Sequence, residues 1–290
     1  MEFRPSPSES QRARVLQPQE LASRGLRPEA AGVPVDWSSW YLTDEEDMGE
    51  SAEQGEIIRT MLSTLGVWAR ERGWPRIYCG GDQFFAWVPS QPLVRVSPDI
   101  YLIEVDEPLA SSLPDSWQTW LPGHRPPHFA VEVVSRDRKK DYEDAPLKYA
   151  LLGVQELVIF DPGVVPRAER SERVLLQLYR RNAAGALLRV YAGPGPVHSI
   201  ELDAYLVVRR DEGPVRLRIA RDAAGQDLVP TETERGDAEA QRADAEAQRA
   251  DAEAQRADAE AEARYEAEEA RRRAEERMRE LEEMIKKLRR

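Results

Sequence analysis

Apolar residues first recur at helical spacing between positions 57 and 68, at Ile57, Ile58, Met61, Leu62, Leu65 and Trp68. Steps of three and four residues place such side chains on one face of an α-helix. Gly73 follows, and glycine is typical of a helix end. The sequence therefore predicts an amphipathic helix that ends near Gly73.

Short β-rich runs come next. "RIYCG", "QFFAWV" and "VRVSPDIYLIEV" are separated by Gly, Pro and Asp and predict consecutive strands. "DEPLASSLPDSWQTWLPGHRPP" is turn-rich and aromatic and predicts a loop or insertion. "HFAVEVV" predicts a strand, "YEDAPLKYALLG" a helix ended by Gly153, and "QELVIFDP" a strand closed by Pro162. Strand, helix and strand in this order imply a right-handed crossover with at least partly parallel pairing.

Two hairpins are predicted after the crossover. "RVLLQLYRRNAAGALLRVYA" turns around residues 182–185, and "VRLRIARDAAGQDLVP" turns around "DAAG". The expected fold class is α/β or mixed α+β, with a central mixed sheet flanked by helices. Its centre should lie near the strands that contain Asp99 and Glu132.

The two ends of the chain differ from this body in composition. Residues 1–40 are rich in Pro, Ser, Arg and Glu without periodicity and predict a flexible extension. Residues 41–230 form the expected globular domain. Residues 231–290 contain the repeat "ADAEAQR", and small side chains follow a seven-residue period at Ala243, Ala247, Ala250, Ala254, Ala257 and Ala261.

This tail predicts a long helix. Thr231 and Glu234 fit a capping box, and the seven-residue spacing continues in a shifted frame through Ala267, Ala274, Leu281 and Leu288. A coiled coil that mediates self-association is the favoured interpretation. Because a seam of Ala buries little, a single exposed helix held by Glu/Arg pairs and a disordered tail remain alternatives.

Composition narrows the class of protein. The 290 residues carry a net charge of −12, which argues against a uniformly positive surface that coats nucleic acid. Arg136, Arg138, Lys139 and Lys140 nevertheless form a compact basic run that either contacts phosphates or is a solvated loop. One cysteine, Cys79, excludes internal disulfides and multi-Cys zinc sites. With no apolar targeting or membrane-spanning segment, we expect a cytoplasmic protein without membrane contact.

Two acidic residues stand where a sheet interior is expected. Asp99 enters one strand and Glu132 lies inside another. A carboxylate in such a place is costly unless it is paired, neutralised or bound to a cation. Carboxylates from two neighbouring strands suit Mg²⁺ (or Mn²⁺), with phosphate and water as further ligands. Alternatively, Asp99 belongs to a turn, and Glu132 pairs with Arg95 or Arg125 or faces solvent.

Residues 41–230 resemble the Uma2 family, a branch of the PD-(D/E)xK nuclease superfamily. The resemblance lies in "SPDIYLIEV", "HFAVEVVS" and "KDYEDAPLKYALLGVQELVIFDP". It implies a restriction-endonuclease-like fold, divalent-metal dependence and a DNA substrate. Asp99 then matches the acid of the Pro-Asp pair, and Glu132 matches the second metal ligand.

The lysine of the superfamily is missing at both expected positions. Two residues after Glu132 stands Val134, and four residues before Tyr149 stands Ala145. Lys148 lies three residues beyond Ala145 on nearly the same helix face and is the preferred catalytic substitute. Lys140 is the alternative.

Other residues near this motif are secondary candidates. Glu56, on the first predicted helix, matches the place where relatives of the superfamily can carry an additional acid. Asp141 is expected to cap the crossover helix and only secondarily to join the site. Tyr149 is expected to pack, and three unclustered histidines, His124, His128 and His198, are assigned no chemistry.

The leading hypothesis is a Mg²⁺-dependent endodeoxyribonuclease with catalytic Asp99, Glu132 and Lys148 and a self-associating C-terminal helix. The alternative is a catalytically degenerate nuclease fold that serves as an interaction or nucleic-acid-binding adapter. The missing lysine and the acidic net charge favour this alternative.

Overall fold

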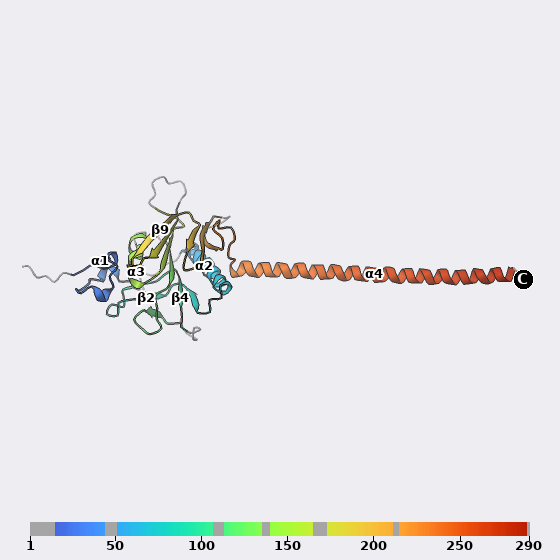
Figure 1. Cartoon of the computed structure of the whole chain (residues 1–290), viewed down its shortest axis with the longest axis horizontal. Coiled ribbons are helices and arrows are strands. Elements are labelled where there is room, and N and C mark those ends of the chain that lie inside the picture. The colour runs from blue at the N-terminus through green and yellow to red at the C-terminus, as the bar shows by residue number, and fades with distance from the viewer. Residues whose placement is uncertain are drawn as a thin grey trace, which may run out of the picture. The chain divides into compact units, whose positions relative to one another are not determined.

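The computed structural model describes residues 15–43, 51–106, 113–134, 140–164, 173–210 and 215–288 (Figure 1). The chain divides into two compact units, Met1–Glu232 and Thr233–Arg290. Arg136, Arg138 and Lys139 of the predicted basic run lie outside the described residues.

The described helices are α1 (Pro18–Ser23), α2 (Ala52–Glu71), α3 (Ala145–Leu152) and α4 (Glu232–Leu288). The described strands are β1 (Ile77–Gly80), β2 (Phe84–Ala86), β3 (Arg95–Val96), β4 (Ile100–Glu104), β5 (Ser116–Gln118), β6 (Phe129–Val133), β7 (Glu156–Phe160), β8 (Leu176–Arg181), β9 (Leu187–Gly193), β10 (Val197–Ser199), β11 (Ala204–Arg209) and β12 (Arg216–Ala220).

The main sheet has the order β1-β4-β6-β7-β8-β9. Its β6 and β7 are parallel and are joined through α3, whereas the other neighbouring pairs are antiparallel. The predicted crossover and the first predicted hairpin, β8–β9, are therefore confirmed. The mixed α+β class with a central mixed sheet and a long C-terminal helix is confirmed as well.

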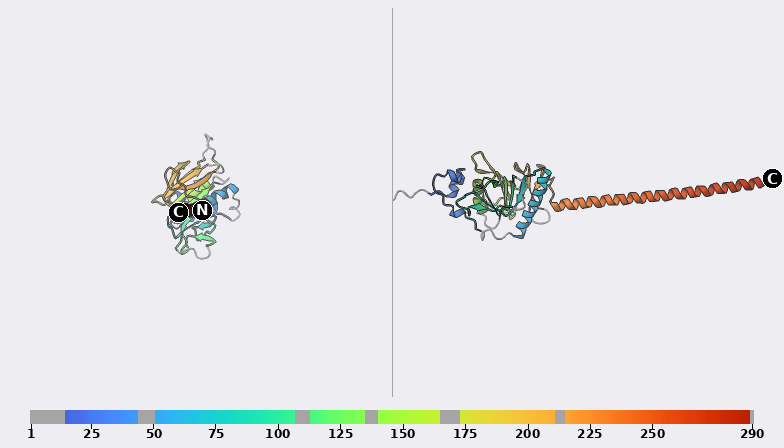
Figure 2. Two further views of the ribbon diagram at one scale, coloured as in Figure 1. Left: turned by 90° about the vertical axis from the view of Figure 1, so that its right-hand side faces the viewer. Right: turned by 90° about the horizontal axis from the view of Figure 1, so that it is seen from below.

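The two faces of the main sheet carry separate apolar clusters. Along β6, Ala130 and Val134 pack with the cluster that includes Tyr149 of α3, whereas Phe129 and Val131 pack with the cluster that includes α2. Side chains alternate between faces along a strand. Glu132 therefore points to the face of the sheet that α3 covers, and α2 lies beside the other face in both Figure 1 and the right-hand view of Figure 2.

The N-terminal segment is not a flexible extension where the structure describes it. Residues 15–43 form α1 and two short 3₁₀ turns, and the buried apolar side chains there include those of Leu16, Leu21, Trp37 and Trp40. These side chains belong to the cluster on the α3 face. The prediction was wrong because large apolar residues without periodicity can still pack against a distant part of the chain.

A second, small sheet has the order β3-β2-β5. The segment predicted as a loop supplies β5, which pairs in parallel with β2. The run "VRVSPDIYLIEV" is divided between β3 in this sheet and β4 in the main sheet. Pro98 and Asp99 lie between these strands, and a proline cannot donate to a sheet ladder.

The second predicted hairpin exists only in part. Strand β12 forms its ladder with β11, whereas the chain returning after "DAAG" contributes a single bridge between Leu228 and Ala220. A third sheet, β10-β11-β12, results. Its strand β12 packs against α2.

Helix α4 runs without interruption from Glu232 to Leu288, or roughly 85 Å at 1.5 Å per residue. Nearly all of its described side chains are exposed. In the part of the chain that the structure describes, no helix combines the length and the apolar character needed to span a bilayer.

Candidate active site

Asp99 stands immediately before β4 and reaches across to β6. Its Oδ2 accepts a hydrogen bond of 2.6 Å from the backbone N–H of Val133. Its Oδ1 accepts one of 3.3 Å from Nε2 of Gln54, near the start of α2. The Asp99 carboxylate is therefore held beside the strand that carries Glu132.

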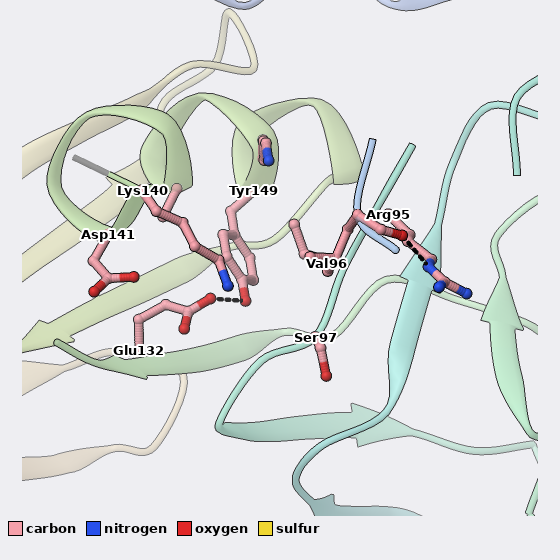
Figure 3. Close-up of a pocket in the computed structure, with 10 residues that line it drawn as sticks. Arg95, Val96, Ser97, Glu132, Lys140, Asp141 and Tyr149 are labelled. Atoms are coloured by element: carbon pink, nitrogen blue, oxygen red, sulfur yellow. Dashed lines mark hydrogen bonds between the residues drawn. The ribbon is translucent and has the colours of Figure 1, made fainter. Parts of the chain in front are cut away.

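Glu132 lies in β6 and is held from the opposite side by α3. The hydroxyl of Tyr149 donates a hydrogen bond to Glu132 Oε1 (Figure 3). Tyr149 is fully buried, so this donor has little freedom to move. Burial and the neighbouring Glu132 charge raise the pKa of the Tyr149 hydroxyl, which keeps it protonated as a donor.

The surroundings of Glu132 favour its neutral form. Burial raises the pKa of the Glu132 carboxyl well above its usual value, and the negative charges of Asp99 and Asp141 raise it further. The Tyr149 hydrogen bond and the positive charge of Lys140 oppose this rise. The Asp99 charge is thus close enough to disfavour ionisation of Glu132.

A pocket opens over Glu132 and encloses about 320 Å³ between atoms, part of it open to solvent. Glu132 and Asp141 contribute carboxylates to its wall, and three cationic side chains also line it, those of Arg95, Lys140 and Lys148. Figure 3 shows Glu132, Lys140 and Tyr149 converging within it. The pocket therefore presents carboxylates surrounded by cations, as a metal-bound phosphate requires.

The two candidate lysines occupy different parts of this pocket. Lys140 begins a π-helical turn, Lys140–Asp144, and its charge acts directly on Glu132. Lys148 lies within α3, and its Nζ is 5.9 Å from the centroid of the Trp40 ring. Trp40 comes from the segment that we expected to be a flexible extension, so this contact could not be predicted from the sequence.

Asp141 does not cap the crossover helix. The residue before α3 is Asp144, and Asp141 instead lies in the π-helical turn with its side chain buried. The prediction failed because the chain coils one turn earlier than the α-helical pattern indicated. The change brings Asp141 into the pocket, where its charge acts on Glu132.

Glu56 is engaged elsewhere, in an ion pair with Arg216 of β12. The residue of α2 that meets Asp99 is Gln54, two positions earlier. A search for acidic residues overlooks Gln54, because its contribution is an amide donor. The sequence signal for Gln54 was its position three residues after Ser51. The Ser51 side chain caps α2 by accepting a hydrogen bond from the Gln54 backbone N–H.

The two arginines considered as partners of Glu132 contact other groups. Arg95 donates from Nε to the Leu42 carbonyl at 3.0 Å, and its guanidinium lies 3.6 Å from the centroid of the Phe84 ring. Arg125 pairs with Asp106 and, at 3.7 Å, with Glu104. Val134 and Ala145, at the expected lysine positions, are buried in the apolar cluster.

The donor set fits a hard divalent cation that brings some of its own ligands. Asp99 and Glu132 supply carboxylate oxygens, the ligand type that Mg²⁺ prefers, and Mg²⁺ usually keeps several waters. Within the described ranges, no group of three or more His, Cys, Asp or Glu side chains is arranged to hold a metal ion. Two protein carboxylates, completed by water and phosphate, are therefore what the site offers.

Comparison with known proteins bears on the same region. The sequence model of the Uma2 family, described as "Putative restriction endonuclease", matches residues 45–208. A crystal structure from Anabaena variabilis, titled as a putative nuclease belonging to DUF820, is similar over 53% of this chain and 76% of that chain, at 12% identity and a TM-score of 0.38. A search of curated proteins finds no match.

Proposed function

This chain belongs to the Uma2 family, and on that premise we propose that it is a Mg²⁺-dependent DNA endonuclease, with Mn²⁺ as a substitute ion. One observation carries the proposal: Asp99 accepts from the β6 backbone N–H next to Glu132, and its charge acts on the Glu132 carboxyl. Two like charges that lie close together and are partly removed from water are costly unless a cation neutralises them.

Asp99 and Glu132 would hold the ion. Bound there, Mg²⁺ would lower the pKa of a bound water and polarise a phosphoryl oxygen. Gln54 and the Val133 N–H fix the Asp99 carboxylate, and the Tyr149 hydroxyl fixes Glu132. Such donors orient ligands that would otherwise rotate away from the ion.

Lys140 is the amine that we assign to the reacting water and the developing charge, in place of our first choice, Lys148. Its charge already acts on Glu132, and its side chain points toward Glu132 and Tyr149 (Figure 3). Lys148, beside Trp40 on the same pocket, is suited to hold a DNA phosphate. The two lysines thus divide between them what one superfamily lysine would do.

Cleavage of supercoiled plasmid with Mg²⁺ or Mn²⁺ tests the proposal. We expect nicked or linear product from the native chain and at least a hundredfold less from Asp99→Asn and Glu132→Gln, which keep side-chain size. Glu71→Gln is a matched control, because Glu71 pairs with Arg221 away from the pocket. Equal cleavage by all four proteins would exclude these carboxylates from catalysis.

The adapter alternative is favoured by one observation, the apolar burial of Val134 and Ala145 at both expected lysine positions. Calorimetric titration with Mg²⁺ separates the two functions. A nuclease site should bind the ion and lose that binding in Glu132→Gln. An adapter without a metal site should give the same small heat with both proteins.

We also propose that the chain self-associates through α4, which would bring two nuclease sites to one duplex. Symmetric pairs of sites suit cleavage of both strands. Light scattering of the full chain and of a chain ending at Pro230 measures this. A dimer that persists after the truncation would contradict the role of α4.

A further inference from the structure

We infer that two copies of this chain pair in parallel through residues 274–288 of α4, and not through the Ala repeat that precedes them. The inference rests on the self-association proposed above and says where it occurs. It follows from two observations on α4, the location of its large apolar side chains and the signs of the charges beside them.

Large apolar residues on α4 gather near its C-terminal end. Met278, Leu281 and Ile285 are exposed by 61%, 53% and 50%, and they follow one another at steps of three and four residues. Ala274 and Leu288 continue these steps in the sequence. In heptad terms this places Met278 and Ile285 at a and Leu281 at d, and Ile at a with Leu at d favours parallel two-stranded pairing.

The charges beside this seam select the same orientation. Arg277 is at a g position, and Glu282 is at the e position five residues later. In a parallel pair, a g position of one helix meets the e position five residues later on the other helix. Arg277 of each copy therefore faces Glu282 of the other copy, which gives two such pairs per dimer. In an antiparallel pair, e positions meet e positions, which brings Glu275 and Glu282 of two copies together and is repulsive.

The Ala repeat has the opposite electrostatic pattern. Its seam, which includes Ala247 and Ala250, has Glu246 at g and Asp251 at e, and the repeat copies these charges every seven residues. A parallel pair would set Glu246 against Asp251, and an antiparallel pair would set Glu against Glu and Asp against Asp. The small apolar area of Ala offers little to offset this repulsion. At neutral pH the repeat therefore stays unpaired.

The same charges stabilise the repeat as a single helix. Arg249 has Glu246 three residues before it and Glu253 four residues after it, both within reach on a helix surface. Further along, Arg273 pairs with Glu269 at 2.7 Å and Arg271 with Glu275 at 2.9 Å. From Thr233 to Arg273 the helix measures roughly 60 Å. The repeat is therefore a spacer between the first unit and the pairing segment.

Sedimentation of the full chain locates the interface. Leu281→Asp should weaken dimerisation by about a hundredfold or more, because two buried leucines are lost per dimer. Ala250→Asp, an acidic substitution in the Ala seam, should leave the dissociation constant unchanged. A dimer that survives Leu281→Asp but dissociates with Ala250→Asp would overturn the inference and leave self-association standing. If the native chain is a monomer, both the self-association and its proposed location are wrong, and the nuclease proposal is unaffected.

Charge reversal determines the orientation. Arg277→Glu and Glu282→Arg should each weaken the dimer on the order of tenfold through two lost pairs, and the double variant should restore it. In an antiparallel dimer, by contrast, Glu282→Arg should strengthen association, because residue 282 would face Glu275 of the second copy. Oxidation of Ala274→Cys in a Cys79→Ser background should link the copies only if these positions meet, as parallel pairing requires.

Discussion

Glu132 in β6 and Glu269 in α4 are both glutamates with a partner on the same chain, yet their surroundings are opposite. Glu132 is partly buried near Asp99 and accepts from a buried tyrosine, and its pKa is raised by burial and by the neighbouring charge. Glu269 pairs with Arg273 on a helix surface that faces water. Water stabilises the second charge at no structural cost, whereas the first is costly unless something binds it.

The same contrast holds for aromatic side chains. Trp40 in the first unit is fully buried, whereas Tyr265 of α4 is 68% exposed. The first unit therefore derives its stability from apolar burial, and one of its buried charged side chains, Asp141, lines the candidate site. Helix α4 derives its stability from local pairs and from whatever binds its C-terminal seam. Four experiments can break or sharpen this comparison.

The largest expected effect is on the burial of Trp40. Trp40→Ala should destabilise the first unit by about 3–5 kcal/mol, the usual cost of truncating a buried tryptophan. Tyr265→Ala should change stability by less than about 0.5 kcal/mol. Urea unfolding followed by near-UV circular dichroism measures both. Trp40→Phe is the control and should cost much less, because the buried Trp40 Nε1 has no hydrogen-bond partner among the described residues. Equal stability of Trp40→Ala and the native chain would restore the interpretation of a flexible extension.

The second test concerns the charge of Glu132. Because its folded-state pKa is raised, the stability it contributes is present below its unfolded pKa near 4.5 and is lost as pH rises through the folded value. In chelator, the stability of the native chain should therefore fall with rising pH more steeply than that of Glu132→Gln. Added Mg²⁺ should reduce the loss only in the native chain. Denaturant titration at several pH values measures the free energy of unfolding of both proteins. If it changed with pH in the same way in both, the pKa of Glu132 would not be raised in the folded state.

The third test distinguishes two neighbours on α2. Gln54→Ala removes the amide that holds Asp99, and we expect the cleavage rate to fall about tenfold, as is usual for donors that orient metal ligands. Glu56→Ala leaves Asp99 untouched and should cleave at the native rate. Plasmid assays under single-turnover conditions compare them. If Glu56→Ala reduced the cleavage rate more than Gln54→Ala, Glu56 would be assigned to the site as an additional acid.

The smallest effect is expected on α4. Arg273→Ala removes an exposed pair four residues apart and should cost about 0.3–0.5 kcal/mol of helix stability at most. Far-UV circular dichroism of the full chain at low and high salt measures the change in helical content. High salt should erase the difference, because it screens exposed pairs. A salt-independent loss would mean that Arg273 makes a contact that the exposed helix does not provide.

Much of the fold could be predicted because it depends on local signals. Helix α2 follows from its spacing and its cap, and α3 ends at Gly153, whose φ of +110° is the left-handed conformation that glycine favours. The order strand, helix, strand predicted the parallel pair β6–β7. Once β6 is formed, the two-residue period of a strand places Glu132 on the same face as Ala130.

The residues that surround the candidate site could not be predicted in the same way. Gln54, Trp40 and Arg95 reach the site region through contacts between segments far apart in the sequence. Strand β5 has no strong pattern of its own and forms because β2 offers it an edge. Asp141 is not at the start of α3, as predicted, because the turn before α3 is π-helical. The form of that turn depends on the residues that pack around it.

By itself, the sequence determined helices α2, α3 and α4, the strands of the crossover and the charge pattern of α4, because these depend on neighbours within about seven residues. Only the tertiary structure decided which donors hold Asp99 and Glu132, which lysine acts on Glu132, and that the N-terminal segment closes over the α3 face. The physical reason is that burial and Coulomb interactions depend on distance in space. A sequence pattern shows which residues are close in space only where those residues are also close along the chain.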